Sequence, residues 1–393
     1  MNAEDFEVVI ERILPGGLGL AHADGRTVMV ALAAPGDRLR VRIDRVKGNV
    51  VFASIVQVIE SSSLRIEPPC PYFGRCGGCD FQQLNYQAQL ETKKEIIRDC
   101  LRRLASLEAI PDFEIVPAPH EWHYRARAQW QFDPVSKRLG YFESGSHRIC
   151  DVAECAVLAP ELQAELERLR RLIEQDALSG NTRYFRAIAG DESVSIADER
   201  GRNPIGRHDG EITRTVHGET YFFNAASFFQ TNNDLLPQLI DEALSEVRGG
   251  KAVELYSGVG LFTLPLARRF WEVVAVESDA PAGNLARHNL AHAGLANAEV
   301  VTRDVADWLA MDSASRETDF LLLDPPRTGA ESRVIFGILK LKPQKICYVS
   351  CDPATLARDL KKLIAGGYSI DSIKAFDMFP QTHHVETVVH LSS

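Results

Sequence analysis

The fold is decided by the run Lys345-Ile346-Cys347-Tyr348-Val349-Ser350-Cys351-Asp352-Pro353. Its first six residues predict a buried strand, and an aspartate followed by a proline is typical of a helix that begins directly afterwards. A thiol between such a strand and helix lies at the carboxyl edge of an open α/β sheet, where ligands bind. The helix dipole there favours a thiolate, which the neighbouring Asp352 partly opposes. We therefore expect Cys351 to react, and we interpret Cys347 and Cys100 as small buried hydrophobes.

Three earlier stretches repeat this pattern of a strand followed by a helix. Each is apolar and precedes a helical segment, and they span residues 252–256, 272–277 and 319–324. Apolar strands that alternate with helices predict a parallel, doubly wound sheet. We therefore expect a Rossmann-like α/β domain from about residue 216 to the C-terminus.

A glycine turn follows the first of these strands. Gly258 and Gly260 lack the third glycine of a dinucleotide-binding turn, which disfavours NAD. Glu277 ends the second strand, where a carboxylate can accept both hydroxyls of a ribose, and Asp304 follows a third strand, near the place of an adenine. The alternative for Glu277 is that it caps the following helix. Together these residues favour a ligand that contains adenosine.

The fourth strand ends in Asp324-Pro325-Pro326-Arg327. The prolines stop the strand and present the aspartate at the ligand-binding edge, where a carboxylate can hydrogen-bond a nucleobase. Enzymes that methylate exocyclic amines commonly have an aromatic residue at the fourth position of a similar turn. Arg327 occupies that position here, so this subclass is less favoured.

The N-terminal part of the chain predicts short strands separated by glycine turns. The strands cover residues 6–10, 27–30, 38–43 and 50–59, with a hairpin signal at Asp24-Gly25. This pattern predicts a small barrel of the OB type, a shape that often binds oligonucleotides. Apolar and basic residues alternate in the third strand, so one of its faces is expected to be basic.

The formal net charge of −10 argues against a protein held to nucleic acid by a broad basic surface. It leaves room for a local basic groove, for which the clusters within residues 38–47, 102–103 and 125–127 are candidates. The alternative for each cluster is a solvated face. No apolar run approaches the roughly 20 residues of a membrane span, and the first residues do not have the pattern of a signal peptide. We expect a cytoplasmic protein that does not bind membranes.

Between the barrel and the α/β part, the sequence mixes helices and strands. Helices are expected over about residues 85–105 and 160–175, and strands over 125–132, 139–143 and 183–189. We interpret this stretch as a central α+β domain.

Three cysteines lie close together at the start of this central part. Cys70, Cys76 and Cys79 share a glycine-rich loop, which lets several thiolates converge on one centre. A fourth ligand must come from Cys150 or Cys155. Four thiolates suit either a 4Fe-4S cluster or a tetrahedral zinc ion, and the ligand types alone do not decide between them.

Taken together, these motifs resemble the RNA uracil-C5 methyltransferase family, which includes bacterial 23S rRNA and tRNA 5-methyluridine enzymes. The resemblance covers nearly the whole chain. Residues 69–79 look like the family's cluster loop, which carries 4Fe-4S in the rRNA members, and Cys155 matches the fourth cysteine. Residues 5–60 are similar to a TRAM domain, an OB-type RNA-binding module. Because tRNA-specific members commonly lack that domain, its presence favours rRNA.

The resemblance also implies roles for individual residues. Cys351 matches the nucleophile, which adds to carbon 6 of uracil so that carbon 5 can accept the methyl group of S-adenosylmethionine (SAM). Glu386 matches the base that removes the proton from carbon 5. The positions that bind the cofactor or the base are matched by Gln230, Tyr256, Glu277, Asp304 and Asp324.

We therefore expect three parts: a TRAM barrel over residues 1–62, a central α+β domain with an iron–sulfur cluster over 63–215, and a Rossmann-like SAM-dependent methyltransferase domain over 216–393. The protein is expected to act as a monomer on a uridine flipped out of 23S rRNA. Two alternatives remain open. One is a tRNA uridine C5 methyltransferase, and the other is an RNA-binding iron–sulfur protein with a vestigial methyltransferase fold.

Overall fold

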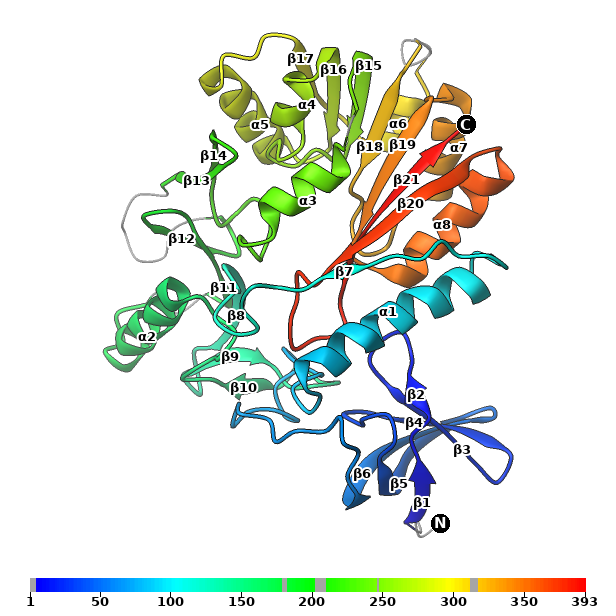
Figure 1. Cartoon of the computed structure of the whole chain (residues 1–393). Helices are drawn as coiled ribbons and strands as arrows, with labels where there is room; N and C mark the ends of the chain where they lie inside the picture. The colour runs from blue at the N-terminus through cyan, green and yellow to red at the C-terminus, as the bar shows by residue number, and fades with distance from the viewer. Residues whose placement is uncertain (1–4, 179–181, 202–209, 246, 312–316) are drawn as a thin grey trace.

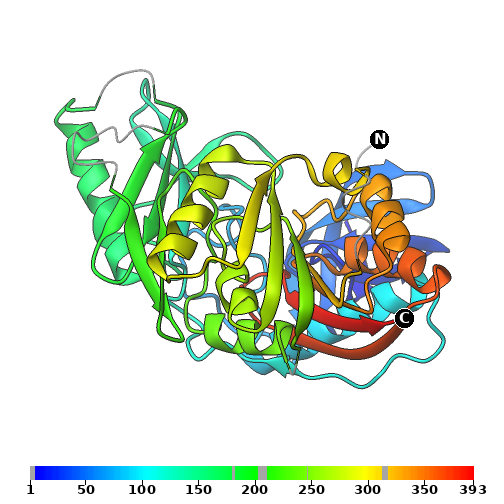
Figure 2. The ribbon, with the colours of Figure 1, turned by 90° about the horizontal axis from the view of Figure 1, so that it is seen from above.

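The computed structural model describes residues 5–178, 182–201, 210–245, 247–311 and 317–393 (Figure 1). Residues 1–4, which the sequence assigned to the barrel, lie outside the described residues. The N-terminal barrel, a central sheet and a C-terminal α/β part follow one another along the chain. Figure 2 shows the central sheet to one side of the C-terminal part. Among the described helices, none combines the length and the apolar character that crossing a membrane would require.

The N-terminal strands form one six-stranded sheet within the described residues, in the order β1-β5-β6-β4-β3-β2. Leu39 and Val41 of β5 are fully buried while the arginines between them are exposed, as the alternating pattern predicted. Asp24 and Gly25 have φ of 48° and 71°, which suits the two-residue turn between β3 and β4 and confirms the hairpin. The strands are β1 (Phe6–Val9), β2 (Arg12–Ile13), β3 (Gly19–Ala23), β4 (Arg26–Val30), β5 (Arg38–Lys47) and β6 (Val50–Glu60).

The basic face of β5 is neutralised by acidic neighbours. Arg38 forms ion pairs of 2.9 Å with both Glu7 and Glu60. Arg42 pairs with Asp5, also at 2.9 Å. Exposed pairs of this kind add little stability, and they agree with the solvated-face interpretation of this cluster.

The central sheet is antiparallel and has the order β10-β9-β8-β11-β12 within the described residues. One face packs against helix α2, where Trp130 and Phe185 meet Leu162 and Leu166 in a buried cluster. The expected strands and helix are confirmed, and two short strands, β10 and β12, are additional. The elements are β8 (Arg127–Asp133), β9 (Arg138–Phe142), β10 (Ile149–Asp151), α2 (Pro160–Glu174), β11 (Tyr184–Ala189) and β12 (Val194–Asp198).

The C-terminal sheet has the order β17-β16-β15-β18-β19-β21-β20-β7 within the described residues. The strands from β17 to β19 are parallel, as predicted, whereas β21 runs antiparallel to both β19 and β20. The strands are β7 (Ile115–Val116), β15 (Gly249–Leu255), β16 (Phe270–Glu277), β17 (Ala298–Thr302), β18 (Phe320–Leu323), β19 (Lys345–Ser350), β20 (Ser369–Phe376) and β21 (Glu386–Ser392).

Helices cover both faces of this sheet. Successive residues of a strand point to opposite faces, and β18 illustrates this: Leu321 and Leu323 join one buried cluster, while Phe320 and Leu322 join another. Both faces are therefore apolar, which explains the continuous apolar runs of the sequence. The helices are α3 (Leu236–Ala243), α4 (Thr263–Ala267), α5 (Ala280–His292), α6 (Val305–Leu309), α7 (Ser332–Leu341) and α8 (Pro353–Ala365).

Helix α1 (Tyr86–Arg103) links the parts of the molecule. It begins where the Asn85 side chain accepts a hydrogen bond of 2.9 Å from the backbone N–H of Ala88. It packs against α8 (Figure 1), and β7, which follows it, extends the C-terminal sheet beside β20. A hairpin of β13 (Ile212–Val216) and β14 (Glu219–Phe223) spans the expected second boundary. The domain limits after residues 62 and 215 stay a prediction.

Candidate active site

The carboxyl ends of the five parallel strands carry the residues that the sequence singled out. Tyr256 follows β15 and Glu277 ends β16. Asp304 lies just beyond β17, Asp324 follows β18 and Cys351 follows β19. Because these strands are parallel and adjacent, their carboxyl ends share one edge of the sheet. The chain order reverses between β15 and β18, which is where ligands bind in open α/β sheets.

The glycine turn after β15 holds the carboxylate of Glu277. Gly258 has φ of 56°, and its backbone N–H donates to Glu277 Oε2 at 2.8 Å. The other carboxylate oxygen accepts from the backbone N–H of Asp279 at 2.7 Å. Helix α5 is capped by Asp279, whose side chain accepts from Ala282 N, so Glu277 is not the cap. A carboxylate has room for further donors beyond these two.

Two other expected cofactor positions have local structural roles as well. Asp304 is the N-cap of α6, because its side chain accepts from the backbone N–H of Asp307 at 3.1 Å. Gln230 is buried in the segment before α3, and among the described residues its side chain makes no hydrogen bond to the carboxyl edge. Neighbouring Phe229 stacks on Phe223 at 4.3 Å between ring centroids, which fixes this segment.

Strand pairing brings Cys351 beside Glu386. Ser350, the last residue of β19, pairs with Thr387 of the antiparallel β21. Cys351, the residue directly after β19, is therefore level with Glu386, the first residue of β21. Helix α8 begins directly afterwards, capped by Asp352, whose side chain accepts from Thr355 N at 2.8 Å.

Burial and nearby carboxylates oppose ionisation of this thiol. Burial, and then Glu386 and Asp324, raise the pKa of Cys351 to about 12, and Arg327 partly offsets the rise. Burial also raises the pKa of Asp324 to about 7, and burial together with Asp324 raises that of Glu386. The helix dipole favours the thiolate of Cys351, as expected, but in the free protein these opposing effects raise its pKa. Desolvation and like charges outweigh the dipole.

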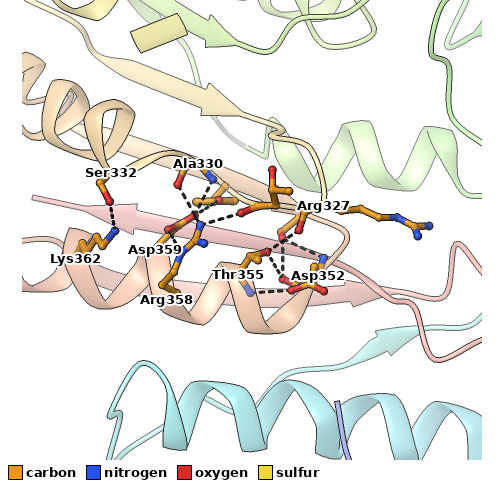
Figure 3. A network of polar contacts seen from close by, with 11 residues as sticks. Arg327, Ala330, Ser332, Asp352, Thr355, Arg358, Asp359 and Lys362 are labelled. Carbon is orange, nitrogen blue, oxygen red and sulfur yellow. Dashed lines mark hydrogen bonds and ion pairs between the residues drawn. The ribbon is translucent and has the colours of Figure 1, made fainter. Parts of the chain in front are cut away.

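Helix α8, which follows Cys351, holds the loop after Asp324 in place (Figure 3). The carboxylate of Asp359 is fully buried and accepts from Ala330 N at 2.8 Å and from Tyr348 Oη at 2.9 Å. Arg358 donates to the carbonyl oxygens of Thr328 and Ala330, each at 3.1 Å. The loop that carries Arg327 is thus held to α8 by several hydrogen bonds.

The loop that leads into Glu386 is held by residues far away in the sequence. Gln381 has φ of 68°. Its side-chain oxygen accepts a hydrogen bond of 3.0 Å from Gln89 Nε2, and its backbone N–H donates to Gln89 Oε1 at 2.9 Å. Its carbonyl accepts from the backbone N–H groups of Asp80 and Phe81. Asp80 Oδ1 accepts from His383 N at 2.8 Å. The cysteine-rich loop and α1 therefore fix the approach to Glu386.

A buried ion pair strengthens this clamp. Lys93 Nζ lies 2.5 Å from Asp377 Oδ1, with both side chains fully inaccessible, and it also donates to the carbonyl of Phe379 at 3.0 Å. Sequence reasoning missed Gln89 and Lys93. The available signal was two polar residues, spaced four apart, on the apolar stripe of the predicted helix.

Four cysteines surround one cavity. Cys70, Cys76, Cys79 and Cys155 line it together with Arg125. Cys150 is buried close enough to this group to act electrostatically on Cys70 and Cys76, and it accepts a hydrogen bond from Arg75. Burial raises the pKa of Cys76 to about 12 and that of Cys79 to about 11. In the described part of the chain, no group of three His, Cys, Asp or Glu residues is arranged to hold a single metal ion.

The strand order, the glycine turn and the acids at the carboxyl edge define the fold of a SAM-dependent methyltransferase. Residues 212–393 match the family model described as tRNA (Uracil-5-)-methyltransferase, and residues 1–56 match the TRAM domain.

Relatives and solved structures extend this match over almost the whole chain. The 23S rRNA (uracil(1939)-C(5))-methyltransferase RlmD of Shewanella amazonensis is 33% identical, over 98% of this chain and 95% of its own. An RNA methyltransferase of Thermotoga maritima is 32% identical, over 98% of both chains. The structure of Pyrococcus abyssi tRNA (uracil-54, C5)-methyltransferase with S-adenosyl-L-homocysteine is 28% identical, with a TM-score of 0.74 over 98% of this chain and 100% of its own. The chain belongs to the RNA uracil-C5 methyltransferase family, whose enzymes use SAM.

Proposed function

We propose that this protein methylates carbon 5 of a uridine in 23S rRNA through a covalent bond between Cys351 and carbon 6 of the uracil. The observation that carries the mechanism is the register of β19 and β21, which sets Cys351 level with Glu386. The rRNA substrate is supported by relatives from Shewanella and Pectobacterium named as 23S rRNA uracil-C5 methyltransferases.

The reaction divides between two side chains. Cys351 loses its proton and its sulfur bonds to carbon 6, which leaves an enolate whose carbon 5 is nucleophilic. Bound SAM supplies the methyl group that bonds to carbon 5. Glu386 then takes the proton from carbon 5, the double bond between carbons 5 and 6 re-forms, and the sulfur leaves as a thiolate. Asp324, whose pKa burial raises to about 7, acts electrostatically on Cys351 and would accept its proton in the first step.

The residues of the carboxyl edge fit SAM. Glu277, fixed by Gly258 N, would accept the ribose hydroxyls, and the open space beside Gly258 lets backbone approach the ligand. Tyr256 borders the same turn with a positive φ of 64°, and Asp304 stands at the next strand end. The resemblance to the family adds Gln230 and Asp324 to the residues that would bind SAM or the target base.

Two variants separate the proposed roles. Cys351→Ala is expected to bind RNA and SAM without methyl transfer, and appreciable turnover would sink the nucleophile role. Glu386→Gln is expected to accumulate a covalent protein–RNA complex that survives denaturing electrophoresis, because the proton on carbon 5 cannot leave. Cys347→Ala is the matched control, since Cys347 is fully buried on the same strand. It should lose stability but keep the methylation chemistry.

A second candidate substrate has an observation in its favour. The tRNA methyltransferase of Pyrococcus abyssi aligns with 98% of this chain, so the N-terminal barrel does not by itself separate rRNA from tRNA enzymes. Tritium transfer from labelled SAM to transcribed 23S rRNA fragments and to tRNA, measured side by side, decides between them. Preferential methylation of tRNA would overturn the rRNA assignment.

We further propose that Cys70, Cys76, Cys79 and Cys155 hold a 4Fe-4S cluster. The four thiols line one cavity, and four cysteine thiolates are the usual ligands of such a cluster. Arg125 lines that cavity, its buried Nε has no hydrogen-bond partner among the described residues, and its charge would balance the thiolates. Methylation needs no electron transfer, so the cluster would be structural.

Anaerobic purification with iron and sulfide analysis tests this proposal. An iron–sulfur cluster gives visible absorption, whereas zinc, which has no redox chemistry, gives none. Cys155→Ser should lose the iron and Cys150→Ser should retain it; the opposite result would reassign the fourth ligand. That the protein acts as a monomer stays a prediction, which light scattering during gel filtration can check.

The remaining alternative is an RNA-binding iron–sulfur protein with a vestigial methyltransferase fold. It predicts RNA binding without turnover on any RNA. A nucleophile and a base brought together by strand pairing argue against it, because neither is needed for binding.

A further inference from the structure

The exposed face of the central sheet carries an unusual set of side chains. Helix α2 covers the other face. On β8 the outward residues are Arg127, Gln129 and Gln131, which alternate with the buried residues of the same strand. The amide groups of Gln129 and Gln131 make no hydrogen bond within the described part of the chain. Phe142 of β9 is 39% exposed on the same face.

This face forms one wall of a furrow that consists of two adjoining sections. The outer section, of about 350 Å³, is lined by Gln129, Gln131 and Phe142. The inner section, of about 290 Å³, is lined by Arg127 and Arg327 among others. Gly77 and Gly78 of the cysteine-rich loop line both sections.

Arg327 connects the inner section of the furrow to the proposed catalytic residues. Arg327 is close enough to Cys351 and Glu386 to lower the pKa of both groups. A strand of RNA whose uridine reaches Cys351 would therefore leave the cleft past Arg327 and Arg127.

The charges of the furrow differ from those of the whole protein. Arg127 and Arg327 line the inner section, and neither of them pairs with a carboxylate in the described part of the chain. The acids of the furrow are occupied: Asp80 binds His383, and Glu143 forms a 2.9 Å ion pair with Arg148. The furrow is thus a local cationic strip on a protein with a net charge of −10.

We propose that this furrow binds the single-stranded nucleotides next to the target uridine, an inference that rests on the proposed function. Arg127 would contact phosphate, the amides of Gln129 and Gln131 would hydrogen-bond base edges, and Phe142 would stack on a base. Single-stranded RNA is recognised in this way, by aromatic stacking and by polar groups that read exposed base edges. Free amides favour base reading, because a purely electrostatic track would need only cations.

The proposal is tested with Gln129→Ala/Gln131→Ala, and with Gln175→Ala as the matched control. Gln175 is exposed at the end of α2, away from the furrow. Loss of two hydrogen bonds should raise the KM for RNA about tenfold, with little change in kcat or in SAM affinity. The double variant should also discriminate less when the nucleotides beside the target are changed. An unchanged KM together with unchanged discrimination would overturn the proposal.

Two further measurements separate base reading from charge attraction. Arg127→Gln should weaken binding of all sequences alike and reduce the slope of log affinity against log salt by about 0.7, the value for one single-stranded phosphate. Photo-crosslinking of 4-thiouridine placed beside the target should label the peptide around residues 127–142. A crosslink confined to the N-terminal barrel, or equal competition by duplex RNA, would contradict the assignment.

Failure of this inference is distinguishable from failure of the proposed function. If the wild-type protein methylates no RNA, the proposed function has failed. If it methylates RNA and the glutamine variant behaves as wild type, the furrow alone has been assigned wrongly.

Discussion

The buried ion pair of Lys93 and Asp377 gives a stability prediction with a defined size. Replacing Lys93 by Met leaves the Asp377 carboxylate buried with no cation, and it removes a 3.0 Å hydrogen bond to Phe379. The second carboxylate oxygen already has no partner within the described residues. Breaking a fully buried pair on one side costs about 3 to 5 kcal/mol, because an uncompensated charge remains in the interior.

The adjacent lysine provides a matched control. Lys94 pairs with Asp112 at 3.6 Å, and the carboxylate of that pair is 84% exposed. Lys94→Met should therefore change the free energy of unfolding by less than about 1 kcal/mol. Adding Asp377→Asn to Lys93→Met should recover part of the loss, since the buried charge is then gone.

Urea unfolding followed by far-UV circular dichroism measures these differences. The free energies of unfolding are taken from the transition in which α1 loses its helical signal. Those of the single variants and the double variant are compared under one set of conditions. If Lys93→Met and Lys94→Met differ by less than about 1 kcal/mol, the interpretation of this pair as a buried, charge-compensated anchor is wrong.

Four other predictions concern the catalytic part. Burial raises the pKa of Glu254 from 4.5 to about 8, so only the unfolded chain loses this proton as the pH rises from about 5 to 8. The stability of Glu254→Gln relative to the wild type should therefore rise across that window by up to about 1.4 kcal/mol per pH unit, and parallel stability curves would contradict this. Because the pKa of Cys351 is about 12, formation of the adduct with 5-fluorouridine RNA should keep accelerating up to about pH 9; a plateau near neutrality would count against a resting thiol. Arg327→Met should shift that profile to higher pH, because Arg327 lowers the pKa of Cys351. Asp359→Asn should cost about 1.5 to 3 kcal/mol and reduce kcat, while Asp371→Asn, in an exposed hydrogen bond to Ser392, should do neither.

The sequence predicted the periodic features of the fold well. Apolar runs followed by helical segments marked β15, β16, β18 and β19, and the alternation in residues 38–43 marked a half-buried strand. These signals are local, because burial of one or both faces of an element appears directly in the spacing of its own residues. The antiparallel β20 and β21 carried no comparable signal of where they would pair.

Part of the candidate site could also be predicted, because residues after adjacent parallel strands must share an edge. Tyr256, Glu277, Asp324 and Cys351 come together by that rule alone. The rule does not predict which of these side chains are ionised. The helix dipole at Cys351 suggested a thiolate, whereas the depth of burial and two carboxylates from other strands make it a thiol.

The sequence by itself therefore determined which elements form and which residue types stand at their ends. Only the tertiary structure decided which distant groups meet. It placed Cys155, and not Cys150, in the lining of the cavity that Cys70, Cys76 and Cys79 also line. It also joined Gln89 to Gln381 across 292 residues. The physical reason is that helix and strand periodicities arise from neighbours within a few residues, whereas desolvation, strand pairing and buried charge pairs depend on how the whole chain closes on itself.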